Sequence, residues 1–302
     1  MAVEQQILKN KELDRKLLEE GYVVVPFLSS QEVQSLVDYY YASHPRQLDG
    51  MYATAHVPDI ALRMRMNDFI KKVFARAIGE MFINCNPLGG SFIAKGKGEK
   101  GTLEPHQDWN IVDEEQYRSF NIWVPLVNLS EKNGVIKVIP GSHTWLKNYR
   151  SANIHSAFSK VNDSVWKILT PLYMNAGEAL IYDHRLIHAS GSNNSDEIRL
   201  AAVYGIIPKG AQMFYYHKAN DETVEVFESN PEFFLYGNIF EGPKGLKSVA
   251  KKPHDFHEVN EEELDKLNGN HRPFRMNSVR KIFELFTAKF QLFLIILPCR
   301  LQ

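Results

Sequence analysis

The amino-acid sequence predicts an α+β chain whose centre is a β-sandwich or barrel, with helices flanking it. From about residue 90 to residue 208, short segments rich in β-branched and aromatic residues recur, and turn-forming residues separate them. These segments are SFIAK, SFNIWVPLV, GVIKVIP, LYMNAGEALIY and RLAAVYGIIP. Many short strands with turns between them are typical of a sandwich or barrel and not of alternating β–α units.

Helical spacing precedes this strand-rich region. Residues 3–20 carry apolar side chains at roughly helical intervals, and Gly21 ends the pattern. The segment YVVVPF predicts a short strand. Ser29 or Ser30 can then cap a helix that has Glu32 in its first turn. A third helix is expected over residues 67–81.

The pattern loosens after Pro208. Residues 212–240 are rich in aromatic side chains, and residues 241–277 are polar and expected to be mostly loop, with one helix near Glu261–Leu267. The run LFLIIL at 292–297 is much shorter than the roughly 20 residues that span a bilayer. A helix packed on the domain or on a second copy is favoured over a membrane-surface helix or a partner-binding tail.

The composition is that of a globular protein without a broad charged surface. Lys plus Arg number 35 against 36 Asp plus Glu, a formal charge of −1, which argues against nucleic acid and anionic lipid as partners. Cys85 and Cys299 cannot build a disulfide framework, and the chain does not begin with a long apolar segment. We therefore expect a cytoplasmic protein.

A metal-ligand pattern occurs at His106-Gln107-Asp108. In an extended segment, side chains two residues apart point to the same face, so His106 and Asp108 project together. With a second histidine opposite, they form a 2-His-1-carboxylate triad that leaves coordination positions open for a co-substrate and O₂. A His-x-Asp pair alone also occurs in surface loops by chance, so the prediction depends on a second motif.

That second motif begins at His188. Ser190 shares its strand face, and Arg199 opens the next strand eleven residues after the histidine. A hairpin of that length can return Arg199 to the neighbourhood of His188. A buried guanidinium there presents a planar fork that matches a carboxylate.

These motifs resemble the phytanoyl-CoA dioxygenase family of Fe(II)- and 2-oxoglutarate-dependent oxygenases over about residues 20–210. The matching residues are His106-Gln107-Asp108, Asn133-Gly134, Pro140-Gly141-Ser142-His143, and His188-x-Ser190 with Arg199. The resemblance implies a double-stranded β-helix (jelly-roll) core flanked by helices. Residues 1–245 then form the oxygenase domain with the N-terminal helices, and residues 246–302 a helical extension packed on it.

The resemblance also implies roles for individual residues. The iron ligands are His106, Asp108 and His188, and the distal carboxylate of 2-oxoglutarate is bound by Arg199 and Ser190. Two further candidates for polar contacts to the co-substrate or substrate are Lys95, on the strand before the His-x-Asp motif, and Asn121, on a strand after it.

Alternatives remain for several of these residues. His184 lies four residues before His188 and shares its strand face, although the spacing to Arg199 favours His188 as the ligand. Arg199 could form an ordinary ion pair with Glu197 or Asp196, and Asn121 could merely satisfy a strand end. Trp109 could line a substrate pocket or simply pack.

The expected reaction is hydroxylation of an aliphatic C–H bond of a small metabolite, with O₂ consumed and succinate and CO₂ released. A non-catalytic jelly-roll protein that binds a metal or small ligand is the alternative. Two segments are expected to act as lids: residues 44–66, with Arg46, Arg63 and Arg65, and residues 212–240, with Phe214, Tyr215, Tyr216, Phe233, Phe234 and Tyr236. A homodimer or a tail-mediated contact is compatible with the apolar C-terminus.

Overall fold

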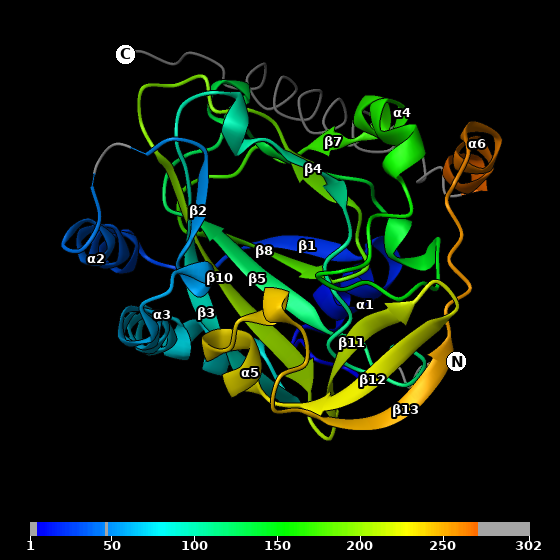
Figure 1. Ribbon diagram of the computed structural model, residues 1–302. Coiled ribbons are helices and arrows are strands. Elements are labelled where there is room, and N and C mark those ends of the chain that lie inside the picture. Colours follow the sequence, from blue (N-terminus) through cyan, green and yellow to red (C-terminus); the bar gives the residue numbers. More distant parts are fainter. Residues whose placement is uncertain (1–4, 46–47, 271–302) are drawn as a thin grey trace, which may run out of the picture.

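A computed structural model describes residues 5–45 and 48–270. Two antiparallel sheets face one another at its centre (Figure 1). The six-stranded sheet has the order β1-β8-β5-β10-β3-β2: β1 Tyr22–Pro26, β8 Glu178–Asp183, β5 Phe120–Pro125, β10 Arg199–Pro208, β3 Cys85–Lys95 and β2 Met51–Ala53. The four-stranded sheet has the order β4-β9-β6-β7: β4 Leu103–His106, β9 His188–Ser190, β6 Ile136–Val138 and β7 Thr170–Pro171.

The chain passes between these two sheets repeatedly from β3 to β10. Strands β3, β5, β8 and β10 belong to the larger sheet, and β4, β6, β7 and β9 belong to the smaller one. Two sheets of four such strands with crossing connections form a jelly roll. The predicted fold class is therefore confirmed.

Helices cover the outer face of the larger sheet. Their bounds are α1 Lys11–Glu20, α2 Ser30–Tyr41 and α3 Ile60–Met81, and shorter helices follow at α4 Asn162–Ile168, α5 Pro231–Tyr236 and α6 Glu261–Asn270. The predicted capping role of Ser29 is confirmed, because Ser29 and Glu32 form a reciprocal capping box. Helix α3 begins seven residues earlier than predicted, because Asp59 caps it by accepting from the Leu62 amide.

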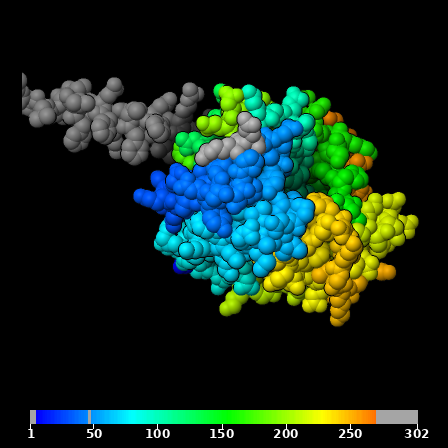
Figure 2. All heavy atoms as spheres, turned by 60° about the vertical axis from the view of Figure 1, so that its left-hand side comes forward, coloured from blue at the N-terminus to red at the C-terminus, as the bar shows by residue number. Residues whose placement is uncertain are grey.

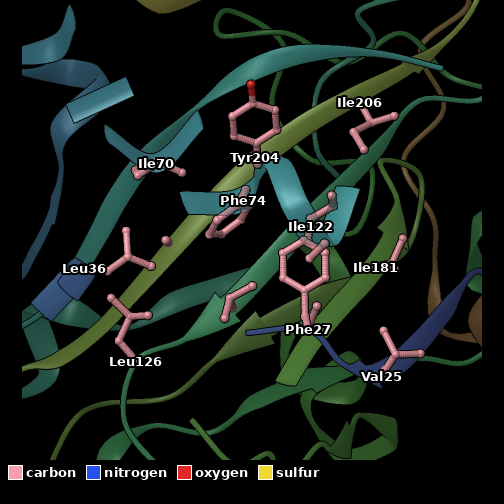
Figure 3. Packing of buried hydrophobic residues seen from close by; sticks show 14 of the residues in the cluster. Val25, Phe27, Leu36, Ile70, Phe74, Ile122, Leu126, Ile181, Tyr204 and Ile206 are labelled. Atoms are coloured by element: carbon pink, nitrogen blue, oxygen red, sulfur yellow. The ribbon is translucent and has the colours of Figure 1, made fainter. Parts of the chain in front are cut away.

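The residues of each central strand alternate between two environments. Ile122 of β5 and Ile181 of β8 pack outward against α2 and α3, in the cluster shown in Figure 3. Their neighbours Trp123 and Tyr182 instead belong to the apolar cluster between the two sheets. This period of two places every second residue of β5, β8 and β10 inside the barrel.

A third sheet lies beyond β10 and was not predicted. Its order is β11-β12-β13, with β11 Met213–Asn220, β12 Thr223–Ser229 and β13 Lys247–Pro253. The expectation of mostly loop over 241–277 was wrong for β13, whose lysine-rich, exposed sequence lacks an apolar pattern. Because β13 pairs with β12, the expected extension after residue 245 begins as a strand of this sheet.

The remaining described part of that extension contacts the jelly roll. Val259 and Leu264 are buried in a cluster with Ile139 and Phe158. Helix α6 matches the helix expected near residue 261. The apolar run at 292–297, Cys299 and Arg46 lie outside the described residues, and within those described no helix is long and apolar enough to cross a membrane.

Candidate metal centre

The side chains of His106, Asp108 and His188 lie together at one end of the barrel. His106 ends β4 and is paired in register with His188, the first residue of β9. The Oδ1 atom of Asp108 lies 3.6 Å from Nε2 of His106 and 3.8 Å from Nε2 of His188. One potential ligand atom from each residue lies within 4.8 Å of the others, so the group can hold one metal ion.

Backbone carbonyls fix which imidazole nitrogen faces the cluster. Nδ1 of His106 lies 2.8 Å from the Glu104 carbonyl oxygen, and Nδ1 of His188 lies 3.0 Å from that of Leu186. A carbonyl oxygen only accepts, so each Nδ1 carries the proton and donates it. In its neutral form, each ring therefore presents its Nε2 lone pair toward Asp108, as a metal ligand must.

The second oxygen of Asp108 is held by two donors from inside the barrel. Nδ2 of Asn121 donates to Oδ2 over 2.8 Å, and the Tyr182 hydroxyl donates to the same atom over 2.9 Å. Asn121 and Tyr182 are partners in the β5–β8 register. The sequence analysis missed Tyr182, although its polar tip at an interior position of an apolar strand was an available signal.

The electrostatics of the metal-free cluster favour the cation-binding forms of His188 and Asp108. Burial opposes protonation of His106, but Asp108 outweighs it and raises the pKa of His106 above its ordinary value, so a metal ion displaces a proton from this ring. Burial and the neighbouring His106 lower the pKa of His188 to about 4, so its ring is neutral at pH 7. Burial opposes ionisation of Asp108, but the adjacent histidines outweigh it and hold the pKa of that carboxyl below its ordinary value. Two neutral imidazoles and one carboxylate on one face are the donor set of non-haem Fe(II) oxygenases.

Arg199 lies buried at the start of β10, and no acidic side chain among the described residues forms an ion pair with it. Its side chain is 3% exposed, and Nη1 donates to the Gly134 carbonyl oxygen over 2.6 Å. Nε makes no hydrogen bond, and the guanidinium carbon lies 5.4 Å from the centre of the Trp123 ring. The alternative of an ion pair with Asp196 does not occur, because Asp196 pairs with Lys97. A guanidinium has five N–H donors, so most of the capacity of Arg199 is available to a ligand.

Lys95 is the second buried basic side chain of this region. It is fully buried and lies beside Arg199 in the β3–β10 register. Nζ donates to Oγ of Ser190 over 2.6 Å and to the carbonyl oxygens of Ser190 and Gly191. Burial, with a smaller contribution from Arg199, lowers the pKa of Lys95 to about 6.

Strand β9 links the metal cluster, by which we mean the side chains of His106, Asp108 and His188, to the two buried basic side chains. It carries both His188 and Ser190, the residue that Lys95 contacts. His188 and Ser190 are two residues apart on this strand, a distance of roughly 6.6 Å. The predicted hairpin between His188 and Arg199 differs in the structure, because β9 and β10 belong to opposite sheets. Arg199 therefore reaches this region from the six-stranded sheet, which lies opposite β9. Lys95 also belongs to the six-stranded sheet, and its hydrogen bond to Ser190 connects the two sheets.

His184, the rival ligand, lies outside the cluster. Its Nδ1 is hydrogen bonded to Oγ of Ser119 at 2.9 Å, and His184 is buried. It is absent from the only group of potential metal ligands found among residues 5–45 and 48–270. The structure therefore gives it a place in the packing beneath the site.

Fold and site together define a jelly-roll protein with an open 2-His-1-carboxylate cluster. The chain belongs to the phytanoyl-CoA dioxygenase family, whose model matches residues 17–201. Among curated relatives, it is 31% identical over 145 residues to Dioxygenase FUM3 of Gibberella moniliformis, covering 44% of this chain and 43% of that one. It is 26% identical over 133 residues to phytanoyl-CoA dioxygenase domain-containing protein 1 of Danio rerio, covering 41% and 46%. The matches thus span about half the length of these relatives.

Solved structures with a similar arrangement include two from nogalamycin biosynthesis. The epimerase SnoN, in complex with Fe³⁺, alpha ketoglutarate and nogalamycin RO, is 20% identical with a TM-score of 0.46, covering 67% of this chain and 86% of that one. The non-heme alpha ketoglutarate dependent carbocyclase SnoK is 17% identical with a TM-score of 0.48, covering 68% and 86%.

Proposed function

We propose that this protein is an Fe(II)- and 2-oxoglutarate-dependent dioxygenase that hydroxylates an aliphatic C–H bond of a small molecule. Overall, substrate, O₂ and 2-oxoglutarate give hydroxylated substrate, succinate and CO₂. Membership of the phytanoyl-CoA dioxygenase family supports the reaction class. His106, Asp108 and His188 are the proposed iron ligands.

One observation carries the co-substrate assignment: Arg199 is buried without a counter-ion. Burying an unpaired guanidinium is costly, and no described acidic side chain forms an ion pair with it. A bound carboxylate removes that cost by accepting the N–H groups that Gly134 leaves free. The spacing of His188 and Ser190 along β9 is comparable with the length of a five-carbon dicarboxylate, so one molecule can reach both ends.

The protein's own groups then have distinct tasks. Asn121 and Tyr182 hold one oxygen of Asp108, so that the other faces the two histidines. Arg199 binds the far carboxylate of the co-substrate, and Lys95 adds positive charge and fixes the Ser190 hydroxyl. The apolar side chains between the sheets keep bulk water from this space. When bound, the iron and 2-oxoglutarate supply the chemistry that activates O₂.

The decisive test is an anaerobic titration with Fe(II) and 2-oxoglutarate. Chelation by both ligands in an open triad is expected to give a weak charge-transfer band at roughly 500 nm. His106→Ala should abolish the band, and Arg199→Ala should shift its appearance to much higher 2-oxoglutarate concentration. Arg15→Ala, at an exposed ion pair, is the matched control and should behave as the unaltered protein.

A metal that binds without producing the band would contradict the co-substrate assignment and favour the non-catalytic, metal-binding jelly roll. Succinate release in the presence of candidate substrates then tests turnover. A product heavier by one oxygen atom identifies hydroxylation. A product that has only lost hydrogen or changed configuration indicates desaturation, ring closure or epimerisation at the same site.

A further inference from the structure

Three aromatic rings from distant segments contact one another, and one of them belongs to Trp109, the residue that follows Asp108. The Trp109 ring lies 6.0 Å from that of Phe240, nearly perpendicular to it. The Phe240 ring in turn lies 5.2 Å from the imidazole of His56. His56 belongs to the short 3-10 helix η1 (Thr54–His56) and Phe240 to η6 (Ile239–Glu241). We refer to His56, Trp109 and Phe240 as the aromatic wall.

Exposed apolar side chains concentrate on the two segments that supply this wall. Among the described residues, the large hydrophobic side chains that remain exposed are Met51, Ile60, Met64, Tyr173, Phe240 and Val249. Four of these six lie between residues 51 and 64 or at Phe240, and Phe240 itself is 62% exposed. Figure 2 shows residues 50–75 and 231–245, blue to cyan and yellow to orange, side by side on this surface. Clustered apolar exposure of this kind marks a binding surface.

Helix α3 fixes the two segments relative to one another. Arg63 is buried and donates to the Val57 carbonyl oxygen through Nε and to that of Gly237 through Nη1. Asn67 donates to the Tyr236 hydroxyl over 3.1 Å. These bonds connect positions up to 174 residues apart, so the placement of the wall is built into the fold. They also mean that two nitrogens of the Arg63 guanidinium are already hydrogen bonded to backbone carbonyls.

We propose that the aromatic wall binds the apolar, flat part of the substrate and makes this enzyme specific for largely apolar, ring-containing molecules. The inference rests on the proposed function and names the substrate class for the same site. Ring faces and edges recognise flat apolar groups through stacked and edge-to-face contacts. Trp109 directly follows the proposed ligand Asp108 in the chain, so one end of the wall is attached to the backbone that carries this ligand. A free amino acid offers no comparable surface to these rings.

Equilibrium dialysis of the metal-free protein with progesterone, a flat tetracyclic probe, tests the proposal without turnover. The unaltered protein should bind progesterone, and L-glutamine should not compete. Phe240→Ala should weaken binding about tenfold, because truncation removes a large aromatic contact area. Tyr173→Ala is the matched control, since Tyr173 is also 62% exposed but is hydrogen bonded to Glu131 and is not a member of the aromatic wall. His56→Ala is a second wall variant that should weaken binding in the same direction.

This design distinguishes failure of the aromatic-wall proposal from failure of the oxygenase assignment. The same preparations are titrated anaerobically with Fe(II) and 2-oxoglutarate, and Phe240→Ala should retain the charge-transfer band while losing progesterone. Equal progesterone affinity in Phe240→Ala and the unaltered protein, or no binding by either, overturns the aromatic wall even if the band forms. Binding to phosphatidylcholine vesicles that depends on Phe240, without progesterone binding, also overturns it and assigns the surface to lipid. Loss of the band in every preparation contradicts the oxygenase assignment alone.

Discussion

The Tyr182 hydroxyl donates a hydrogen bond to Oδ2 of Asp108 at 2.9 Å, from the strand that faces the metal cluster across the barrel. Nδ2 of Asn121 donates to the same oxygen, so this atom already has two protein partners. The other carboxylate oxygen, Oδ1, is left to the space between the two imidazoles. Asp108 is thereby oriented before any metal arrives.

Tyr182→Phe should lower metal affinity about 10- to 100-fold, the usual cost of removing a group that orients a ligand. The aromatic ring stays in the barrel, so the fold should be retained. Competition with a chelator for Co(II), followed by its visible absorption, measures the change. Tyr215→Phe is the matched control, because its hydroxyl donates to the Ile239 carbonyl oxygen, outside the cluster. Equal Co(II) affinity in the two variants would show that Tyr182 only packs.

Lys95 should make binding of 2-oxoglutarate dependent on pH. Its pKa is lowered to about 6 by burial and by Arg199, so in the ligand-free protein the amine is largely neutral at pH 7.5. An incoming dianion favours the protonated form, and binding above pH 6 should therefore take up protons. The contribution of Lys95 to the affinity for 2-oxoglutarate should therefore be greatest near or below pH 6, and it should fall as the pH rises.

Calorimetric titration of the Fe(II)-loaded protein with 2-oxoglutarate, in two buffers of different ionisation enthalpy, measures this uptake. Lys95→Met should abolish the uptake that Lys95 contributes and weaken binding roughly tenfold or more, the scale of one lost charge-assisted hydrogen bond. Lys97→Met, at an exposed ion pair, should change neither quantity. Unchanged proton uptake in Lys95→Met would assign the pH dependence to another group.

The sequence located the metal cluster because its residues follow local rules. His106 and Asp108 are two residues apart, and His188 was recognised by its fixed spacing from Ser190 and Arg199. The contacts that orient these groups connect positions far apart in the chain, such as Tyr182 with Asp108 and Arg63 with Gly237. No local pattern encodes such contacts, because they depend on how separate strands and loops are brought together.

The same distinction explains the errors in the fold. Strands β3, β5, β6, β8 and β10 carry β-branched and aromatic residues and fall in segments predicted as strands. Strand β13 instead consists mostly of exposed polar residues and is stabilised by pairing with β12. Edge strands of this kind use lysine to discourage further pairing, which also removes the apolar alternation that identifies a strand. Asn121 was expected to make polar contacts with the co-substrate, whereas in the structure its Nδ2 donates to Asp108, a contact between strand β5 and the His-x-Asp segment that no local pattern encodes.

Arg150 should support both stability and the site. Its Nε donates to the Asp108 carbonyl oxygen over 2.7 Å, and its guanidinium forms an ion pair with Glu114 in which both side chains are largely buried. Arg150→Met leaves a buried carboxylate unpaired and should lower the free energy of unfolding by about 3–5 kcal/mol. Urea denaturation measures this loss. Arg15→Ala, at an exposed i,i+4 pair, should cost below about 1 kcal/mol, and a similar cost for both variants would contradict the argument.

Gly134→Ala should weaken co-substrate binding without removing any charge. Gly134 has a φ of 72°, its carbonyl oxygen accepts from Arg199, and an added Cβ would lie 2.5 Å from the Gly191 carbonyl oxygen, a partner of Lys95. The clash is with backbone, so the loops that hold both basic side chains must separate. Left-handed strain alone should lower the free energy of unfolding by roughly 1–2 kcal/mol, and we expect Gly134→Ala to lower it by more. The charge-transfer band should also appear only at higher 2-oxoglutarate concentration. Gly245→Ala isolates the strain, because Gly245 has a φ of 78° and no atom within 4 Å of its added Cβ. Urea denaturation and anaerobic titration of both variants provide the comparison. Identical 2-oxoglutarate affinities would mean that the loop at Gly134 can shift without moving Arg199.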